Sequence, residues 1–388
     1  MRGNESSTAT SVKVFIDREA EWTARMNMVD RAQRFLILTT YYFGSDERSG
    51  NMVDALLAAA CRGVRVVLVL DRFGQRLAQN LGRPSEHRRL NERLGEFRAA
   101  GGLIVECAPR SFRHRWVGGG MHVKIQVSEA GAAIFGSSNI AHHSFSRWNE
   151  VSLEIEGNMV AELLQEACRF ANLPQRESAD FGAWLPATST AARIPLRYLR
   201  EDPEARSGAL FPFDSVDNRL TAELVALIDR AQRSLCITSF YYKPVASLKA
   251  ALLRACQRGV AVEIFHSHRD SLEVSQLPWI SASAQYRVML NAGARIYENR
   301  AGEHSKVILV DGREVAVGSY NMEHAAHDRL IEAMIFSDDV ALCECFRSFF
   351  DTLRRSPDNS MLSTRWHSEL PATLRLKRWL YRPLQRWI

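Results

Sequence analysis

Two short motifs pair a histidine with a lysine two residues later: His122-Val-Lys124 and His304-Ser-Lys306. Side chains two positions apart in a strand point the same way, so each pair is expected to project together. One imidazole could attack phosphorus and another could protonate a leaving oxygen, since histidine has a reference pKa of about 6.5. The two ammonium groups would stabilise charge on the nonbridging oxygens. Acting together, the motifs therefore suit chemistry on a phosphodiester.

Further polar residues follow both motifs at matching distances. They are two serines, two asparagines and two glutamates: Ser137, Asn139, Glu150, Ser319, Asn321 and Glu332. The serines and asparagines lie in Gly-Ser turns, where the backbone can approach a ligand closely, so they are predicted to bind substrate. Each glutamate could accept a hydrogen bond from an imidazole and fix its tautomer.

These correspondences belong to an internal duplication of the chain. Val29–Tyr42 (VDRAQRFLILTTYY) matches Ile228–Tyr241 (IDRAQRSLCITSFY), and Ala55–Val64 matches Ala251–Val260. The histidine, asparagine and glutamate pairs all share one shift of 182 residues, which predicts a tandem repeat. Each half alternates helices with short, nearly continuous apolar strands. This pattern is typical of an α/β sheet covered on both faces.

The repeat gives the expected domain limits. The sequence predicts a first domain over 1–171, a linker over 172–217, a second domain over 218–360 and a basic tail over 361–388. The linker is rich in Pro, Ala and Ser and only weakly periodic. Apolar and polar residues alternate through Val123–Val127, so the His-x-Lys segments are expected to lie within strands.

Two smaller patterns leave their roles open. Tyr41-Tyr42 and Tyr241-Tyr242 end predicted strands, where they could pack in the core or line a substrate crevice. Other histidines could be metal ligands, but they lack cysteine or carboxylate partners at zinc spacing, so surface or supporting roles are favoured. These histidines are His142, His143, His266, His268, His324 and His327.

The second motif, His304-x-Lys306-x4-Asp311, resembles the HKD signature of the phospholipase D superfamily. The first copy is similar but has Glu129 where the family usually has Asp. The order of paired tyrosines, ALLRACQRGV, motif and glutamate most resembles bacterial cardiolipin synthases without membrane spans. The resemblance implies two α/β domains of phospholipase D type, related by pseudo-two-fold symmetry, with one site at their interface.

The resemblance also implies a ping-pong transfer through a phosphohistidine, with no metal or other cofactor. It makes His122 the expected nucleophile and His304 the expected general acid. The full predicted catalytic set is His122, Lys124, Glu129, Glu150, His304, Lys306, Asp311 and Glu332. If the motif carboxylate only braces a turn, Glu129 can serve in place of Asp. If the exact reach of the motif carboxylate matters, the first repeat is impaired and the protein binds substrate without turning it over.

Positive charge is concentrated at the C-terminus. Of the net charge of +6, residues 361–388 contribute +5, from six basic side chains and one acidic. The rest is nearly neutral, which argues against a broad nucleic-acid-binding face. Leu374–Ile388 mixes Leu and Trp with Arg and Lys, as membrane-surface anchors do, with docking on the protein core as the alternative. No apolar stretch approaches the roughly 18 residues of a membrane span, and no signal peptide is recognisable.

The favoured function is phosphatidyl transfer between phospholipids, of cardiolipin synthase type, by a cytoplasmic protein peripheral on the inner face of a bacterial membrane. The expected partners are phospholipid substrates and an anionic membrane surface contacted by the tail; nucleic acid is not favoured, and no oligomeric state is predicted. Two alternatives stay open. One is hydrolysis of phospholipids or nucleic acid by the same chemistry, and the other is a non-catalytic lipid-binding relative.

Overall fold

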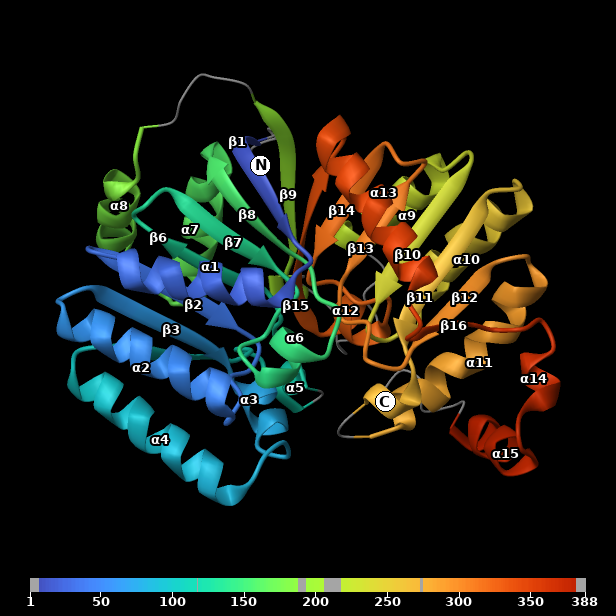
Figure 1. Cartoon of the computed structure of the whole chain (residues 1–388), viewed down its shortest axis with the longest axis horizontal. Coiled ribbons are helices and arrows are strands. Elements are labelled where there is room, and N and C mark those ends of the chain that lie inside the picture. Colours follow the sequence, from blue (N-terminus) through green and yellow to red (C-terminus); the bar gives the residue numbers. More distant parts are fainter. Residues whose placement is uncertain (1–6, 117, 188–192, 206–217, 273–274, 382–388) are drawn as a thin grey trace. The chain divides into compact units, whose positions relative to one another are not determined.

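Apolar runs in both halves of the chain form the central strands of two sheets with matching topology. The computed structural model describes residues 7–116, 118–187, 193–205, 218–272 and 275–381 (Figure 1). The chain divides into two units, Met1–Tyr198 and Leu199–Ile388. Both contain a mixed sheet with helices packed against it, so the predicted α/β class and the duplication are confirmed.

The sheet of the first unit has the strand order β9-β1-β8-β7-β6-β2-β3-β4. Strands β2, β3 and β4 are parallel, whereas β6, β7, β8, β1 and β9 join antiparallel. The strands are β1 (Ser7–Phe15), β2 (Phe35–Thr40), β3 (Arg65–Asp71), β4 (Leu103–Cys107), β5 (Gly120–Met121), β6 (Lys124–Ser128), β7 (Ala132–Gly136), β8 (Ser152–Gly157) and β9 (Ile194–Glu201). The helices are α1 (Arg18–Arg31), α2 (Glu47–Cys61), α3 (Arg72–Ala78), α4 (Pro84–Ala99), α5 (Phe112–Trp116), α6 (His142–Ser146), α7 (Asn158–Phe170) and α8 (Gln175–Trp184).

Strand β2 is buried on both sides, which explains its continuous apolar run. Leu36 and Leu38 join the core beneath α1, α2 and α4. Phe35 instead stacks on Phe181 of α8, with ring centroids 4.5 Å apart. Side chains alternate along a strand, so adjacent residues of β2 meet different layers of helices.

The second unit repeats this arrangement. Its order is β15-β14-β13-β10-β11-β12-β16, and β10, β11 and β12 are parallel. The strands are β10 (Ser234–Ser239), β11 (Ala261–Ser267), β12 (Arg295–Asn299), β13 (Val307–Val310), β14 (Glu314–Gly318), β15 (Leu330–Ser337) and β16 (Asn359–Met361). The helices are α9 (Arg219–Arg230), α10 (Ala246–Gln257), α11 (Leu277–Asn291), α12 (His324–Asp328), α13 (Val340–Arg355), α14 (Trp366–Glu369) and α15 (Ala372–Tyr381), with short 3-10 turns at Pro203–Ala205 and Arg269–Ser271.

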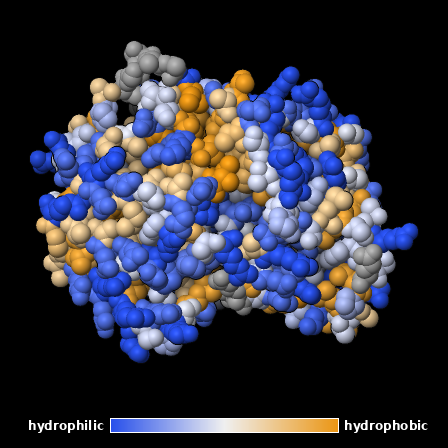
Figure 2. All heavy atoms as spheres, in the orientation of Figure 1, coloured by the Kyte–Doolittle hydropathy of each residue, from blue (hydrophilic) through white to orange (hydrophobic). Residues whose placement is uncertain are grey.

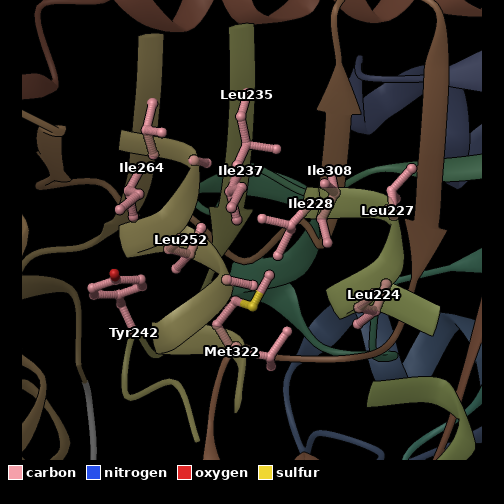
Figure 3. Close-up of a cluster of buried hydrophobic side chains, with 14 of the residues drawn as sticks. Leu224, Leu227, Ile228, Leu235, Ile237, Tyr242, Leu252, Ile264, Ile308 and Met322 are labelled. Carbon is pink, nitrogen blue, oxygen red and sulfur yellow. The ribbon is translucent and has the colours of Figure 1, made fainter. Parts of the chain in front are cut away.

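The core of the second unit joins helix and strand residues of the repeated segments. Leu224 and Ile228 of α9 and Leu252 of α10 pack with Ile237 of β10 and Ile308 of β13 (Figure 3). The repeated segments DRAQR and ALLRACQRGV therefore correspond to helix ends, and a central strand follows each of them. This is the predicted order of elements.

The segment expected to be a linker is partly structured. Within 172–217 the structure forms α8 and β9, and β9 pairs with β1 between Ile194 and Leu196. Phe181 and Trp184 of α8 stack on Phe35, and Glu177 forms an ion pair with Arg65, which the weak periodicity of the segment did not reveal. The two units therefore divide within β9, between Tyr198 and Leu199. Residues 188–192 and 206–217 of the expected linker lie outside the described residues.

The basic tail contains two short helices, α14 and α15. Helix α15 packs on α11, and Arg378 is buried with its guanidinium donating to the carbonyl of Ser283 at 2.5 Å. The same guanidinium lies 5.2 Å from the ring centroid of Trp366. The described part of the tail is therefore docked on the second unit, which was the alternative to a free anchor. Residues 382–388 lie outside the described part.

Docking leaves one apolar side of α15 exposed. Leu376, Trp379 and Leu380 have exposed fractions of 57%, 68% and 54%. Orange apolar atoms reach the surface among hydrophilic ones where Figure 1 places α15 (Figure 2). None of the helices within the described ranges is long and apolar enough to cross a bilayer.

Candidate active site

The motif residues lie at the starts of two equivalent strands. Lys124 is the first residue of β6, and His304 and Lys306 directly precede β13. The lysine of each motif turns back on its own histidine: Lys124 Nζ donates to the carbonyl of His122 at 2.6 Å, and Lys306 Nζ donates to that of His304. All four residues are buried. Each ammonium thus lies against the backbone of its own histidine, and both histidines lie just before a strand and not within it as expected.

An aromatic ring packs edge-on against each imidazole. The centroids of Tyr41 and His122 are 4.7 Å apart with an interplanar angle of 82°, and those of Phe240 and His304 are 4.7 Å apart at 71°. Both aromatics directly follow the first parallel strand of their sheet, β2 or β10. Tyr41 therefore contacts the site, as one reading of the paired tyrosines allowed. In the second unit Phe240 takes that position instead of Tyr241 or Tyr242.

Two threonines fix the backbone of the motifs. Thr39 Oγ1 donates to the carbonyl of Val123 at 3.1 Å and accepts from the N–H of Ile125 at 2.9 Å. In the second unit, Thr238 Oγ1 accepts from the N–H of Val307 at 2.9 Å. Sequence reasoning did not select these threonines. Their signal was their shared position in the repeated strands, one residue from the strand end.

The residue before each histidine is held by the end of the neighbouring parallel strand. Asp71 accepts hydrogen bonds from the N–H groups of Met121 and Gly74, each at 2.7 Å. Ser267 Oγ accepts from the N–H of Glu303 at 2.9 Å and donates to its carbonyl at 3.2 Å. Burial raises the pKa of Asp71 to about 7, although its backbone donors and Lys124 act against this. Asp71 and Ser267 differ in type, so the internal repeat gave no signal for their shared role.

The motif serines use their hydroxyls within the fold. Ser137 Oγ donates to the carbonyl of Val151 at 3.1 Å and accepts from its N–H at 3.0 Å. Ser319 Oγ accepts from the N–H of Ala333 at 3.1 Å and donates to the carboxylate of Glu332. Each serine thus holds the backbone of the residue that follows the motif glutamate, which is Val151 in the first unit and Ala333 in the second. Their predicted contact with substrate stays a prediction.

The asparagines occupy positions suited to a ligand. Asn139 Oδ1 accepts from Thr40 Oγ1 at 3.3 Å, and Asn321 Oδ1 accepts from the N–H of Phe240 at 3.2 Å. Both side chains are buried. Among the described residues, the amide nitrogen of Asn139 has no hydrogen-bond partner. A buried donor without a partner is costly, so this nitrogen is poised to bind a ligand oxygen.

Glu129 and Asp311 make equivalent contacts away from the histidines. Glu129 accepts from the N–H groups of Gln33 at 2.6 Å and Phe35 at 3.1 Å. Asp311 accepts from the N–H groups of Gln232, Arg233 and Ser234, at 3.0, 2.7 and 2.8 Å. Although burial acts to raise the pKa of Asp311, these donors hold it below its usual value.

The motif carboxylates follow the far ends of β6 and β13, roughly 15 Å of strand from the lysines. The structure therefore does not bring Glu129 or Asp311 to the histidines, and their placement departs from the predicted catalytic role. Both brace the start of the first parallel strand of their unit. Glu150 and Glu332 are buried, and their predicted bonds to the imidazoles stay a prediction.

The other histidines belong to local networks. His143 contacts Tyr42 through a hydrogen bond and Trp148 through its ring, with centroids 4.0 Å apart. His266 bonds to the hydroxyl of Tyr286 at 2.6 Å. His327 Nδ1 lies 2.8 Å from Thr221 Oγ1. In the described parts of the chain, no three His, Cys, Asp or Glu side chains are grouped as metal ligands.

Known proteins share these features across most of the chain. A family model described as "Cardiolipin synthase, PLD-like domain" matches residues 26–170 and 224–354. Cardiolipin synthase B of Shigella flexneri is 25% identical over 358 residues, covering 88% of this chain and 78% of its own, and that of Salmonella typhimurium is 26% identical over 354 residues, covering 86% and 76%.

A solved structure supports the fold. Phosphatidylserine synthase of Haemophilus influenzae has a TM-score of 0.73 at 12% identity, covering 99% of this chain and 98% of its own. The predicted fold of phospholipase D type is thereby confirmed. Because the family model covers both repeats and includes both motif histidines, the chain belongs to the phospholipase D superfamily, in the family of cardiolipin synthase PLD-like domains.

Proposed function

We propose that the protein is a phosphatidyltransferase of cardiolipin synthase type. The observation that carries this proposal is the matched construction of the two motifs, each with a buried histidine, a lysine bonded to its carbonyl and an edge-on aromatic. The relatives named cardiolipin synthase, matched over most of their own length, support the lipid substrate. Phosphodiester transfer needs one nucleophile and one acid, and each repeat supplies one imidazole.

The first half of the reaction forms a covalent intermediate. A ring nitrogen of His122 attacks the phosphorus of a phosphatidylglycerol donor, and the bond from phosphorus to the glycerol headgroup oxygen breaks. The imidazolium of His304 gives its proton to that oxygen, so free glycerol leaves. Lys124, Lys306 and the amide nitrogen of Asn139 stabilise negative charge on the nonbridging oxygens.

The second half returns the enzyme to its starting state. A headgroup hydroxyl of a second phosphatidylglycerol attacks phosphorus and gives its proton to His304. The bond between phosphorus and His122 breaks, which releases cardiolipin. Water in place of the hydroxyl would release phosphatidic acid, so the acceptor decides between transfer and hydrolysis.

We further propose that the protein works at an anionic membrane surface, on the cytoplasmic side. The exposed Leu376, Trp379 and Leu380 of α15 and the positive charge of the tail support this placement. In this arrangement Arg378 holds the helix on the second unit while the apolar side of the helix meets lipid.

The experiment for this function traps the covalent intermediate. The protein is mixed with phosphatidylglycerol labelled in its acyl chains, quenched in denaturant at neutral or alkaline pH, where phosphohistidine survives, and digested. Label is expected on the peptide that contains His122, and it should be absent from the His122→Ala variant. The His304→Ala variant should accumulate little label because the leaving oxygen lacks its acid.

Turnover of the same variants completes the test. Each single variant should lose several orders of magnitude in lipid turnover, and the double variant should be little worse, because residues that act as a unit are not additive. Near-normal turnover of the His122→Ala variant would contradict the proposal that the two motifs act together. Glu92→Ala, an exposed change on α4, serves as the control that keeps activity.

A further inference from the structure

The two repeats differ in the segment that precedes the motif histidine. In the second unit β12 ends at Asn299, and His304 follows five residues later. In the first unit β4 ends at Cys107, and His122 follows fifteen residues later. The additional residues include helix α5. Because the second unit builds the same motif without such a segment, building the motif does not require α5.

Helix α5 exposes two large aromatic side chains. Phe112 is 76% exposed and Trp116 is 75% exposed. They are four residues apart, so they are neighbours on one side of the helical turn. Large apolar side chains gathered at the surface mark interaction sites more often than isolated ones do.

Arginines surround these aromatics. A surface pocket of about 280 Å³ is lined by Arg72 and Arg76 of α3 and by Arg115, Phe112 and Trp116 of α5. Arg115 donates to the carbonyl of Arg110 at 2.6 Å. None of the ion pairs formed within the described ranges involves Arg72, Arg76 or Arg115. Their positive charges are therefore available to an anion from outside the chain.

The geometry points to a membrane contact. We infer that the α5 surface inserts its two aromatics into the headgroup region of an anionic bilayer while its arginines bind lipid phosphates. The α5 surface consists of Arg72, Arg76, Phe112, Arg115 and Trp116. This inference rests on the proposed function, since an enzyme that acts on phospholipids must hold its motif at the bilayer.

One carboxylate connects the α5 surface to the catalytic motif. Asp71 directly precedes Arg72 and caps α3 through the N–H of Gly74. Its other oxygen accepts from the N–H of Met121, next to His122. A bilayer bound at the α5 surface would therefore place lipid headgroups on the first unit, near the backbone that carries His122.

The chemistry of the surface favours lipid over nucleic acid. Phe and Trp projecting beside Arg are the composition of elements that lie in a membrane interface. Binding of single-stranded nucleic acid relies on a basic groove that tracks several nucleotides. Here three arginines gather around a single pocket, which suits one or two headgroups.

Vesicle binding of the full-length protein tests the inference. Co-sedimentation is measured with phosphatidylglycerol vesicles and with phosphatidylcholine vesicles. Binding to a labelled single-stranded oligonucleotide is measured separately in solution. The variants are Phe112→Ser/Trp116→Ser and Arg72→Glu/Arg76→Glu. Matched controls are Val340→Ser, which changes an apolar residue that is 77% exposed in the second unit, and Arg88→Glu, which reverses an exposed charge on α4.

The aromatic variant should bind phosphatidylglycerol vesicles at least about tenfold more weakly, and Trp116→Phe should largely retain binding, because the inserted ring is kept. The arginine variant should lose binding selectively to the anionic vesicles, and both controls should bind like the unaltered protein. Wild-type binding by the aromatic variant, with unchanged near-ultraviolet circular dichroism, would overturn the inference. Selective loss of oligonucleotide binding would also overturn it, in favour of nucleic acid.

The same preparation separates this inference from the proposed function. Binding is measured without turnover, and lipid products of the unaltered protein are analysed in parallel. Vesicle binding that depends on Phe112 and Trp116, without any lipid product, would reject the transferase and leave the membrane contact standing. Lipid product together with unaltered binding of the aromatic variant would reject the membrane contact alone.

Discussion

Individual residues of the two motifs divide into those that we propose contact a substrate and those that hold the motif in place. The histidines, lysines and asparagines lie at one end of β6 and β13, while Glu129 and Asp311 bond to backbone near the other end. The sequence selected the histidines, lysines and asparagines from their types and spacing, and Glu129 and Asp311 from the resemblance. It could not separate the two groups, because a signature records spacing and does not record which atoms a carboxylate faces.

Glu129 illustrates the difference. Because its two oxygens accept from Gln33 and Phe35, as Asp311 accepts from the equivalent backbone, we expect Glu129→Asp to keep or raise activity. Glu129→Ala should lower the free energy of unfolding by about 1–2 kcal/mol, since two N–H groups lose their acceptor. Chemical denaturation and lipid turnover measure the two effects. Unchanged stability combined with lost turnover in Glu129→Ala would instead assign Glu129 a catalytic role.

Asp71 makes stability depend on pH. Its pKa is raised from 3.8 to about 7 in the folded protein, so the folded state binds more protons than the unfolded state between these values. Stability should therefore be highest below pH 4 with respect to this group, fall as pH rises toward 7, and be level above it. A shift of this size corresponds to up to about 4 kcal/mol.

The Asp71→Asn variant tests this dependence because it cannot titrate. Denaturation midpoints measured from pH 5 to pH 8 should show a loss of stability with rising pH that is smaller in the variant than in the unaltered protein. Asp71→Asn should also reduce turnover less than His122→Ala does, because Asp71 acts through its hydrogen bond to the backbone of Met121. Parallel pH profiles for the two proteins would contradict the raised pKa.

At the scale of elements, helices and strands with strong patterns were predictable and short segments were not. The buried runs of β2, β3, β10 and β11 were recognised because both of their faces are covered. Helix α8 was interpreted as part of a linker, since it is attached by Phe181, Trp184 and the ion pair of Glu177 with Arg65 and not by a repeated apolar stripe. The His-x-Lys segments were placed inside strands because alternation continues into the strand that follows them.

Helix α15 combines the two readings of the tail, because it docks through Arg378 and exposes Leu376, Trp379 and Leu380. We expect Trp379→Ser/Leu380→Ser to release the protein partly from phosphatidylglycerol vesicles while leaving the fold intact. Salt should weaken binding of the unaltered chain, since each basic residue near an anionic surface contributes about 1 kcal/mol. Vesicle partitioning and thermal unfolding are measured together, with Val340→Ser as the exposed apolar control. Equal partitioning of all three proteins would limit α15 to a structural role.

For the whole molecule, most of the predicted fold and the pairing of the motifs followed from the internal duplication. A constant shift of 182 residues linked the motifs, and the two sheets share the topology that this shift implies. The sequence also shows that the repeats differ, in the longer segment before His122 and in Tyr41 opposite Phe240, but it did not show what these positions do. That this segment forms α5, and that Tyr41 and Phe240 each pack edge-on against a histidine, depends on local packing.

The choice of substrate is the central claim for the whole molecule. A phosphodiester is common to lipids and nucleic acids, so the motifs alone do not decide between them. Outside the tail the positive and negative charges of the sequence nearly balance, which argues against a broad basic track for a polyanion. The exposed Trp and Leu side chains beside basic residues, on α15 and on α5, favour a bilayer.

The most direct test is a product analysis with purified protein at physiological salt. Phosphatidylglycerol vesicles and single- and double-stranded DNA are incubated with matched protein concentrations, and lipids and DNA fragments are quantified. The account predicts cardiolipin and free glycerol as main products, phosphatidic acid as a minor one, and little or no DNA cleavage, with all turnover lost in the His122→Ala variant. Fast DNA cleavage without lipid turnover, or cardiolipin formation that survives His122→Ala, would contradict it.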